Sequence, residues 1–356
     1  MFIFYSENSE KLSDNFHDNL INKSMDANVY PGDSIQNAIN NVSSGGTVIV
    51  YPGLYKENLF VDKPLVIMSK EGTPANTVVQ AADPEKDVFN VTADKVTISG
   101  FNITGAQSNA GIYYSGSDGN ISGNKLDYNK YGILLKNSKN ITIRNNTAFY
   151  NVFGIYLSYS GENVLENNKA NNCSHCGIYV ENSTENELIF NVANSNYKYA
   201  MYLKSSNNNW LKNNNISNLD VVVDKDGIKL EDSDNNRLIN NDISNNWKGV
   251  NLSNSSDNEL NKNRVSANYF SVLLLNSNNN KLLDNVIELN KYDFSISLGS
   301  SQNNILNGNT VGLNKETAGF NKEIKIFYSH DSTNNTLEGV LYTDNGKGTG
   351  GIFRVK

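Results

Sequence analysis

Apolar residues alternate with polar ones in short runs along this chain, and the runs recur at steps of 21 to 27 residues. One and three positions after a small residue stand aliphatic side chains, as in Ile133 and Leu135, with a mostly polar residue or tyrosine between them. Apolar residues two apart predict a short strand with one buried face. The small residues that mark the repeats are Gly111, Gly132, Gly154, Gly177, Ala200, Gly227, Gly249, Ser271 and Ser295.

Asparagines separate these runs, and their positions predict corners where the chain turns from one strand to the next. Asparagine tolerates the left-handed backbone conformation, and stacked asparagines can hydrogen-bond into a ladder. Each repeat therefore reads as three short strands joined by asparagine-marked corners. The first corner carries Asn120, Asn140, Asn163, Asn186, Asn209, Asn236, Asn258, Asn280 and Asn304. The second carries Asn145, Asn168, Asn191, Asn214, Asn241, Asn263, Asn285 and Asn309.

A near-constant period of this size is typical of stacked units that cannot bury their apolar faces alone. A parallel β-helix fits, with coils of about 22 residues pairing at about 4.8 Å. The rival is a leucine-rich repeat, which usually needs a helix or 3₁₀ segment in every unit. The segments between corners are too short and too rich in asparagine for that. We therefore predict an all-β solenoid.

The region before the repeats predicts a cap for the solenoid. Asp33 followed by Gln36 suits a capping box, and an apolar stripe runs from Ile35 to Val42. An open β-helix end exposes unpaired backbone, which a short amphipathic helix at about 33–42 would cover.

The predicted organisation is one β-helix between two irregular ends. Residues 1–28 form an irregular leader, in which Phe2-Ile3-Phe4-Tyr5 is too short for a signal-peptide core, so no secretion signal is visible. The β-helix covers 29–343, and 344–356 form a tail. Within the β-helix we expect regular coils at about 110–314 and a last irregular coil at about 323–343.

One stretch adds a family resemblance. Residues 31–69, PGDSIQNAINNVSSGGTVIVYPGLYKENLFVDKPLVIMS, resemble the opening of NosD-type and related β-helix proteins of the pectin-lyase-like superfamily. The repeats, G-I-x-L followed by S-x-x-N-x-(L/I)-x-x-N, are similar to that group's coils, so the resemblance covers nearly the whole chain. It implies a right-handed parallel β-helix. It implies little about function, since the superfamily holds lyases, hydrolases, esterases, epimerases, tailspikes and surface proteins.

The amino-acid composition limits the kinds of partner that we expect this protein to bind. Hydrophobic residues make up 38% of the chain, which suits thin coils, and the formal net charge of −7 is spread over scattered charges of both signs. Nucleic-acid binders carry basic stripes, so we expect no nucleic-acid partner. No stretch approaches the length of a transmembrane segment. We expect a monomer located in the periplasm, the cell envelope or outside the cell.

The residue between the two apolar sites of the first strand should face outward. In three consecutive coils it is Tyr156, Tyr179 and Tyr202, followed by Lys229 in the next coil. Exposed aromatic rings in a row indicate a binding face, and rings flanked by polar groups suit sugars. The alternative is that tyrosine is simply a good strand residue. The resemblance implies the same sheet as the usual glycan groove.

Acidic residues cluster around a longer repeat step, together with Lys225 and Lys229. They are Asp220, Asp224, Asp226, Glu231, Asp232 and Asp234. Such oxygens could hold Ca²⁺, and paired acids suit glycoside hydrolysis. The candidate catalytic residues are Asp226, Lys229 and Glu231, and the candidate metal ligands are Asp220, Asp224 and Asp226. The alternative is a solvated turn of an acidic protein.

Cys173-Ser174-His175-Cys176 contains both cysteines of the chain and one of its three histidines. This spacing could hold a metal or form a disulfide, yet a structural zinc site wants four ligands. The NosD resemblance implies an association with copper. The alternative is packing, since Cys176 stands where Tyr131, Phe153 and Tyr199 stand in other coils.

Several superfamily signatures are missing, namely Gly-His-Gly, Asp-Pro-His-Asp and Asp-Phe-Ile-Phe-Gly, and His17 and His330 lie outside the regular repeats. We therefore expect a non-catalytic, surface-associated protein that binds polysaccharide and requires no cofactor. The alternatives are a Ca²⁺-dependent polysaccharide lyase or epimerase, and a structural surface-layer spacer.

Overall fold

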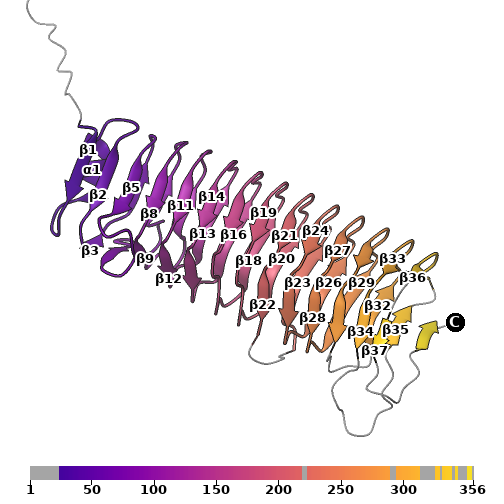
Figure 1. The fold of residues 1–356 in the computed structure, drawn as a ribbon. Helices are drawn as coiled ribbons and strands as arrows, with labels where there is room; N and C mark the ends of the chain where they lie inside the picture. Colours follow the sequence, from indigo (N-terminus) through magenta and orange to yellow (C-terminus); the bar gives the residue numbers. More distant parts are fainter. Residues whose placement is uncertain are drawn as a thin grey trace, which may run out of the picture.

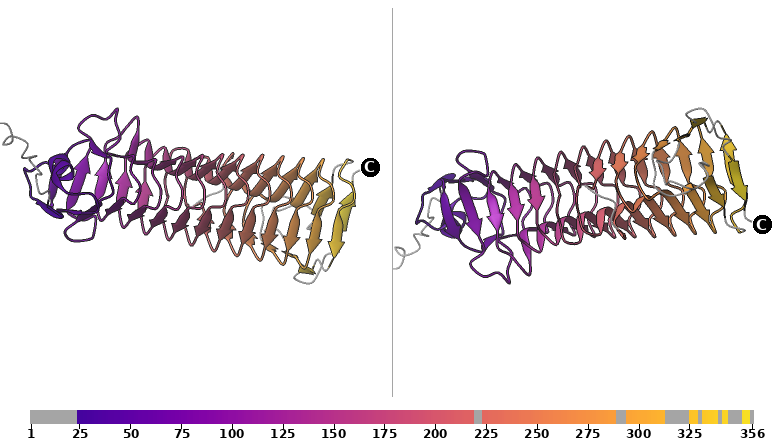
Figure 2. Two further views of the ribbon diagram at one scale, coloured as in Figure 1. Left: turned by 90° about the horizontal axis from the view of Figure 1, so that it is seen from above. Right: turned by 90° about the horizontal axis from the view of Figure 1, so that it is seen from below.

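A computed structural model describes residues 24–218, 223–288, 294–312, 325–328, 331–338, 341–343 and 351–354. In these residues the chain winds into a right-handed parallel β-solenoid, as predicted, whose coils stack along one axis (Figure 1). Within this part of the chain, no helix has the length and apolar character needed to cross a membrane. The strands of successive coils lie side by side in rows that run the length of the molecule (Figure 2).

Three ladders of strands form the walls. Sheet 1 consists of β4 (Leu59–Val61), β7 (Phe89–Val91), β10 (Ala110–Tyr114), β13 (Tyr131–Lys136), β16 (Phe153–Ser158), β18 (Cys176–Glu181), β20 (Tyr199–Lys204), β23 (Asp226–Glu231), β26 (Lys248–Ser253), β29 (Phe270–Leu275), β32 (Phe294–Gly299), β35 (Lys325–Tyr328) and β38 (Gly351–Arg354). Sheet 2 consists of β1 (Asp26–Val29), β2 (Thr47–Val50), β5 (Val66–Ser69), β8 (Thr97–Ser99), β11 (Asn120–Ser122), β14 (Thr142–Arg144), β17 (Val164–Glu166), β19 (Glu187–Ile189), β21 (Trp210–Lys212), β24 (Arg237–Ile239), β27 (Glu259–Asn261), β30 (Lys281–Leu283), β33 (Ile305–Asn307) and β36 (Thr336–Glu338).

Sheet 3 closes the coil in two sections. The first section is β3 (Gly53–Lys56), β6 (Thr77–Gln80), β9 (Asn102–Thr104), β12 (Lys125–Asp127) and β15 (Thr147–Phe149). The second is β22 (Asn215–Ser217), β25 (Asp242–Ser244), β28 (Arg264–Ser266), β31 (Val286–Glu288), β34 (Thr310–Gly312) and β37 (Leu341–Thr343). Single bridges from Thr147 through Lys169 and Val192 to Asn215 join the two sections.

The register places like residues over like. Ile155 of β16 pairs with Ile178 of β18, and Leu157 pairs with Val180. Each of these side chains is fully buried, so the core is a set of aliphatic columns along the axis. This is the alternation that the sequence predicts.

The helix α1 (Ile35–Asn41) covers the N-terminal end, as predicted, and buries Ile35 and Ile39. Its cap differs from the expected one. Ser34, not Asp33, is the N-cap, and its hydroxyl accepts from Asn37 N at 3.2 Å. The Gln36 side chain does not close a capping box but exchanges two hydrogen bonds with the Phe60 backbone, at 2.7 and 3.1 Å. It therefore occupies backbone groups of the sheet's terminal strand β4.

The solenoid reaches beyond the predicted limits at both ends. Asp26–Val29, of which only Val29 was assigned to the β-helix and the rest to the leader, form β1 and pair with β2. Gly351–Arg354, assigned to the tail, form β38 and pair with β35. Each strand is only four residues long, and so short a pattern is hard to separate from irregular chain. Residues 1–23, as well as most of 344–356, lie outside the described residues.

Buried asparagines hydrogen-bond from coil to coil. Asn241, for example, donates its backbone N–H and its Nδ2 to Oδ1 of Asn263, both at 2.9 Å, and donates Nδ2 also to Leu211 O at 2.8 Å. Two such ladders run along the corners that flank sheet 2, and a third, less regular one lies between sheets 3 and 1. The ladder members include Asn163, Asn186, Asn209, Asn236, Asn258, Asn280 and Asn304; Asn124, Asn146, Asn168, Asn191, Asn214, Asn241, Asn263 and Asn285; and Asn129, Asn151, Asn196, Asn246 and Asn268.

The sequence analysis expected the same asparagine to adopt the left-handed conformation and to form the ladder. In the structure two neighbouring residues share these roles. The left-handed residue is the one before the ladder asparagine, as with Asn240, whose φ is 55°, before Asn241. Asn140 and Asn145 occupy left-handed positions instead of ladder positions, and the ladder member beside Asn145 is Asn146. The third ladder was not predicted, because its asparagines recur less regularly.

We predict that Asn241→Ala destabilises the solenoid by roughly 3 kcal/mol, since the variant leaves buried donors of Asn214 without their acceptor. The measurement is the urea midpoint followed by circular dichroism. Asn240→Gly is the matched control, because residue 240 is exposed and glycine accepts a positive φ. A midpoint for Asn241→Ala equal to that of the control would contradict the role given to the ladder.

Candidate functional site

The outer face of sheet 1 presents two side chains per coil beside the small residue. A Cβ placed on Gly154 would lie 2.6 Å from Gly177 O and 2.8 Å from Ala170 Cβ, so this position faces the crowded interior. The residues one before and two after it, Phe153 and Tyr156, both lie outside, with ring centroids 5.5 Å apart. Because the small residue points inward, the outward residues on either side of it lie three positions apart and not two, and they form two columns along the sheet.

The first aromatic cluster fills these columns over the coils of β13 to β20. The rings of Tyr156 and Tyr179 stack at 4.7 Å, and those of Tyr179 and Tyr202 at 4.9 Å. Phe153 and Tyr199 pack beside this row. The predicted stack of three tyrosines is present.

The prediction that these rings are exposed is wrong for two of them. Only 8% of Tyr179 and 7% of Tyr202 is accessible. The coil spacing of about 4.8 Å is close to the ring separation, so each ring covers the face of the next. The row offers ring edges, and half-buried Tyr156 and Tyr199 hold most of its accessible aromatic surface.

Acidic residues bind the tyrosine hydroxyls of this cluster. Tyr179 Oη donates to Glu181 Oε1 at 3.1 Å, Tyr156 Oη donates to the other oxygen of Glu181, and Tyr202 bonds Glu231. Burial, together with these carboxylates, raises the pKa of all three hydroxyls well above the usual range. The tyrosines are therefore neutral hydrogen-bond donors.

A charged group continues the face beyond the tyrosines. Lys229 Nζ lies 2.5 Å from Glu231 Oε2 and also lies over the rings of Tyr199 and Tyr202, at 5.5 and 5.2 Å. Burial lowers the pKa of Lys229, but the bond to Glu231 and the charge interactions with Tyr199, Glu231 and Asp226 together outweigh burial, so the pKa of Lys229 is raised. The same bond lowers the pKa of Glu231. Lys229 and Glu231 share the outer face, as expected.

Asp226 lies on this face with one carboxylate oxygen unsatisfied. It is 4% exposed, its Oδ2 accepts from Asn251 Nδ2 at 2.9 Å, and its Oδ1 lies 3.8 Å from Lys248 Nζ. Among the described residues no donor forms a hydrogen bond to Oδ1. Burial raises the pKa of Asp226, against the opposing effects of Lys248 and Asn251. We call Asp226, Lys229, Glu231, Lys248 and Asn251 the charged centre.

The other acids of the predicted cluster do not join the charged centre. Asp232 is an exposed left-handed corner residue, and Asp234 Oδ1 accepts from Ser256 N at 2.6 Å. Asp224 has a φ of 64° in the turn before β23, and Asp220 lies outside the described residues. Alternation along the strand could place Lys229 and Glu231, but it could not place residues in the longer repeat step.

A second aromatic cluster lies beyond the charged centre, and the sequence interpretation missed it. Trp247 stacks on Tyr269 at 3.9 Å with an angle of 10° between the rings, and both meet Phe270 edge-on. Trp247 and Tyr269 stand two positions before the small residues of their coils. His175 and Lys198 occupy that position in earlier coils, so reading this column of the alignment would have found the cluster.

The two cysteines belong to different environments. Cys173 Sγ would lie 3.2 Å from a Cβ on Gly154, inside the coil, whereas Cys176 packs with Tyr179 and Tyr202 in the first aromatic cluster. Both thiols are free, so no disulfide forms in this structure. Burial raises the pKa of Cys173 to about 12 and that of Cys176 well above its usual value. Cys176 thus has the packing position that the sequence offered as the alternative.

His175 packs against aromatic rings, with its own ring 4.8 Å from that of Phe153. Burial, with Lys198 as a second cause, lowers its pKa, so the imidazole is neutral at pH 7. No three His, Cys, Asp or Glu side chains gather as ligands of one metal ion in the described part of the chain.

The coils and their repeats define the class of this protein as a right-handed β-helix. Residues 171–311 match the family described as right handed beta helix region. Residues 39–226, slightly more than half of the chain, match the family described as periplasmic copper-binding protein (NosD). The chain belongs to the NosD family.

One curated relative and several solved structures are also similar. A cell surface glycoprotein of Methanothermus fervidus is 37% identical over 81 residues, which are 22% of this chain and only 13% of that protein. The mannuronan C-5 epimerase AlgE4 A-module of Azotobacter vinelandii has a TM-score of 0.56 at 17% identity, with 85% of this chain and 90% of that chain covered. A DFA-IIIase of Arthrobacter chlorophenolicus A6 has a TM-score of 0.58 at 13% identity, with 92% and 98% covered. These structural similarities describe the fold alone.

The copper named in the family description finds no assembled ligand set in the described residues. Soft thiolates and imidazoles are the ligands that copper favours. Here Cys173 and Cys176 belong to different packing environments, their thiols resist ionisation, and His175 packs against aromatic rings. These three residues, as placed, do not fit a copper centre.

We predict that neither thiol of the native protein reacts with Ellman's reagent at pH 8, because both are buried and un-ionised. Unfolding in guanidinium should release two reactive thiols. Rapid reaction of either thiol in the native protein would contradict the positions described for Cys173 and Cys176.

We predict that Asp226→Asn is more stable than the wild type at pH 7. The raised pKa means that Asp226 favours folding only while protonated, below about pH 3.9, and that this contribution is lost as the pH rises through the folded-state pKa. The amide avoids that loss, so its advantage in thermal midpoint should shrink between pH 7 and pH 3. A variant that is less stable than wild type at pH 7 would show that Lys248 fully compensates the burial.

Proposed function

We propose that this protein is a non-catalytic glycan-binding protein of the cell envelope, with its binding face on the outside of sheet 1. The observation that carries the proposal is the order of groups along that face. The charged centre lies between the two aromatic clusters, in one uninterrupted ladder of paired strands from β13 to β29. An elongated ligand would thus meet apolar surface at both ends and polar groups in the middle.

Sugars fit this order because a pyranose ring has apolar faces and a rim of hydroxyl groups. Half-buried Tyr156, Tyr199, Trp247 and Tyr269 would supply apolar contact. Glu231 and Lys248, whose side chains are each 29% accessible, would offer an acceptor and a donor to the sugar hydroxyl groups. Tyr179 and Tyr202, which are nearly covered, would support the face and not contact the ligand.

Recognition is favoured over catalysis by the pairing of the carboxylates. Glycoside hydrolysis needs two carboxyl groups, one acting as acid and the other as base or nucleophile. Lys229 engages Glu231, two tyrosine hydroxyls engage Glu181, and Asp226 is buried and pairs with Lys248. None of these three carboxylates is both unpaired and open to a ligand. A Ca²⁺-dependent lyase or epimerase remains the alternative that the experiment below separates.

The names of the relatives support a location in the cell envelope. The family is described as periplasmic, and the archaeal relative is named as a cell surface glycoprotein. A protein that stays at the surface and holds a polysaccharide would agree with both names.

We predict that the wild type binds a member of an array of neutral and uronic-acid polysaccharides, with the polysaccharide left intact. Trp247→Ala should weaken this binding at least tenfold, about 1.4 kcal/mol, through lost stacking. Arg144→Ala is the matched control, because Arg144 is exposed on sheet 2, away from this face, and should bind as the wild type does.

The array is read with Ca²⁺ and with a chelator, and its products are analysed by mass spectrometry. Ca²⁺-dependent shortening or modification of a polysaccharide would replace the proposal with the enzymatic alternative. No binding to any polysaccharide would leave the structural spacer. Equal loss in Trp247→Ala and Arg144→Ala would move the site away from sheet 1.

A further inference from the structure

We infer that the outer face of sheet 2 carries a second, separate binding groove, built around Trp210, for a neutral glycan. The groove has a volume of 530 Å³ and lies on another wall of the solenoid from the face of sheet 1. The inference does not depend on the proposed function of sheet 1.

The floor of the groove comes from four successive coils. Trp210 of β21, Arg237 of β24, Glu259 of β27 and Lys281 of β30 follow one another in register. All four are first residues of strands whose middle residues are buried leucines, so the four side chains lie on the outside. They form one column along the solenoid axis.

Trp210 is exposed and yet held in place. The residue is 42% accessible, and the guanidinium of Arg237 lies 5.2 Å from its ring centroid. Arg237 is in turn held by Glu259, with Nε 3.8 Å from Oε2. A fixed indole offers a large apolar contact and loses little side-chain freedom when a ligand binds.

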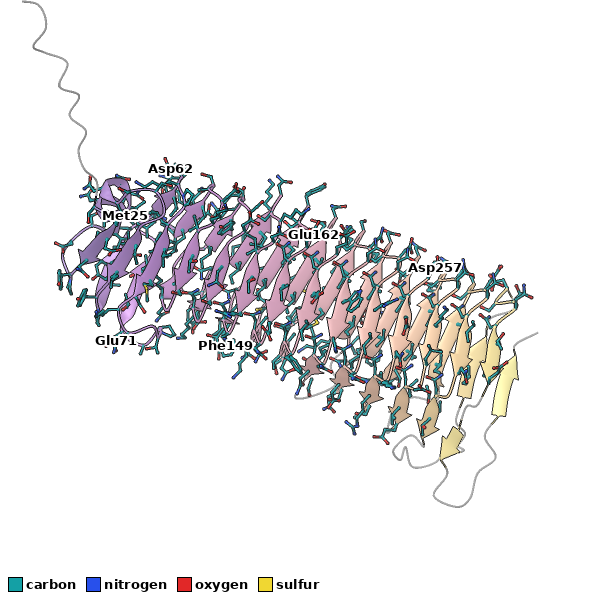
Figure 3. The ribbon with its side chains drawn as sticks, turned by 45° about the horizontal axis from the view of Figure 1, so that its top comes forward. Met25, Asp62, Glu71, Phe149, Glu162 and Asp257 are labelled. Atoms are coloured by element: carbon teal, nitrogen blue, oxygen red, sulfur yellow. The ribbon has the colours of Figure 1, made fainter. Side chains whose placement is uncertain are left out.

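Corner residues form a rim beside this floor. Asn208, Asn235, Asp257 and Asn279 line the groove and share a φ between 57° and 59°. They recur at the coil spacing of about 4.8 Å, and the buried asparagine ladder behind them fixes their positions. Asp257 lies on the same long edge of the solenoid as the equivalent corner residue Glu162 (Figure 3). A linear, extended glycan along the axis would meet one polar rim group per coil.

The charges select the class of ligand. Arg237 and Lys281 are balanced by Asp257 and Glu259, so the lining carries no net charge. Arg237 and Glu259 also neutralise each other at short range. A polyanion would meet two carboxylates and a polycation two basic groups, whereas a neutral, hydroxyl-rich chain can use donors and acceptors of both kinds.

The alternative is an ordinary solvated sheet face, and the column itself argues against it. In the four preceding coils the position of Trp210 holds Asn120, Thr142, Val164 and Glu187, none of them aromatic. The large aromatic ring therefore stands beside the basic, acidic and amide groups that line the groove, and the preceding coils of the column have no such ring.

The chain has two tryptophans, one on each proposed binding face, so binding at sheet 1 and binding at sheet 2 can be measured separately. In Trp247→Phe the remaining tryptophan is Trp210, so its fluorescence reports on the groove. The probes are cellotetraose and mannotetraose as neutral tetrasaccharides, and an alginate tetrauronate as the acidic one. We expect a saturable change in Trp210 emission with a neutral probe and at least tenfold weaker binding of the tetrauronate.

Calorimetry on the full-length chain then tests the residue itself. Trp210→Ala should weaken binding of the neutral probe at least tenfold, while Lys212→Ala, the next outward residue on the same strand, should leave it unchanged. Thermal midpoints of the two variants, measured alongside, show that both remain folded. Trp210→Ala should also keep the sheet 1 binding that Trp247→Ala loses, which separates failure of one site from failure of the other.

Three results would overturn the inference. They are no response to either neutral tetrasaccharide, binding that Trp210→Ala leaves intact, and preference for the tetrauronate.

Discussion

The hydrogen bond between a buried asparagine and the asparagine one coil above is the interaction on which the structure depends. Each corner must turn the chain from one sheet onto the next inside a thin coil, where backbone groups cannot reach water and must find partners. The ladder asparagine satisfies them by accepting from the preceding coil and donating to the following one, as Asn241 does between Asn214 and Asn263. Because the bonds connect neighbours only, stability accumulates coil by coil.

Because the buried ladders hold the coils together, the identity of the outward residues can differ from coil to coil. The core columns and ladders fix the backbone, so an outer side chain repeats at the coil spacing whatever its chemistry. That spacing brings tyrosines of consecutive coils into face-to-face stacks, which strengthens the wall but hides the ring faces of Tyr179 and Tyr202. Aromatic surface remains where the stack ends or where a ring stands alone, as with Trp210.

The sequence predicted the parts of the structure that depend on period. The β-solenoid, the inward aliphatic columns, the capping helix and the common face of Lys229 and Glu231 all follow from alternation and repeat length. The sequence could not show which corner residue adopts the left-handed conformation and which forms the ladder, because asparagine occurs at both positions. It also could not show that Asp226 joins that face, since the inward-turned Gly227 breaks the alternation there, nor that stacking would cover the tyrosines.

The central claim is that a glycan lies on the outer face of sheet 1 across the charged centre. Hydroxyl-radical footprinting of the protein with and without a bound polysaccharide tests it most directly, because oxidation of aromatic side chains reports their contact with solvent. The account predicts that oxidation of Tyr199, Trp247 and Tyr269 falls on binding, while that of Phe190, an exposed ring at the corner that follows β19 of sheet 2, is unchanged. Unaltered oxidation of all three under saturating polysaccharide would contradict it.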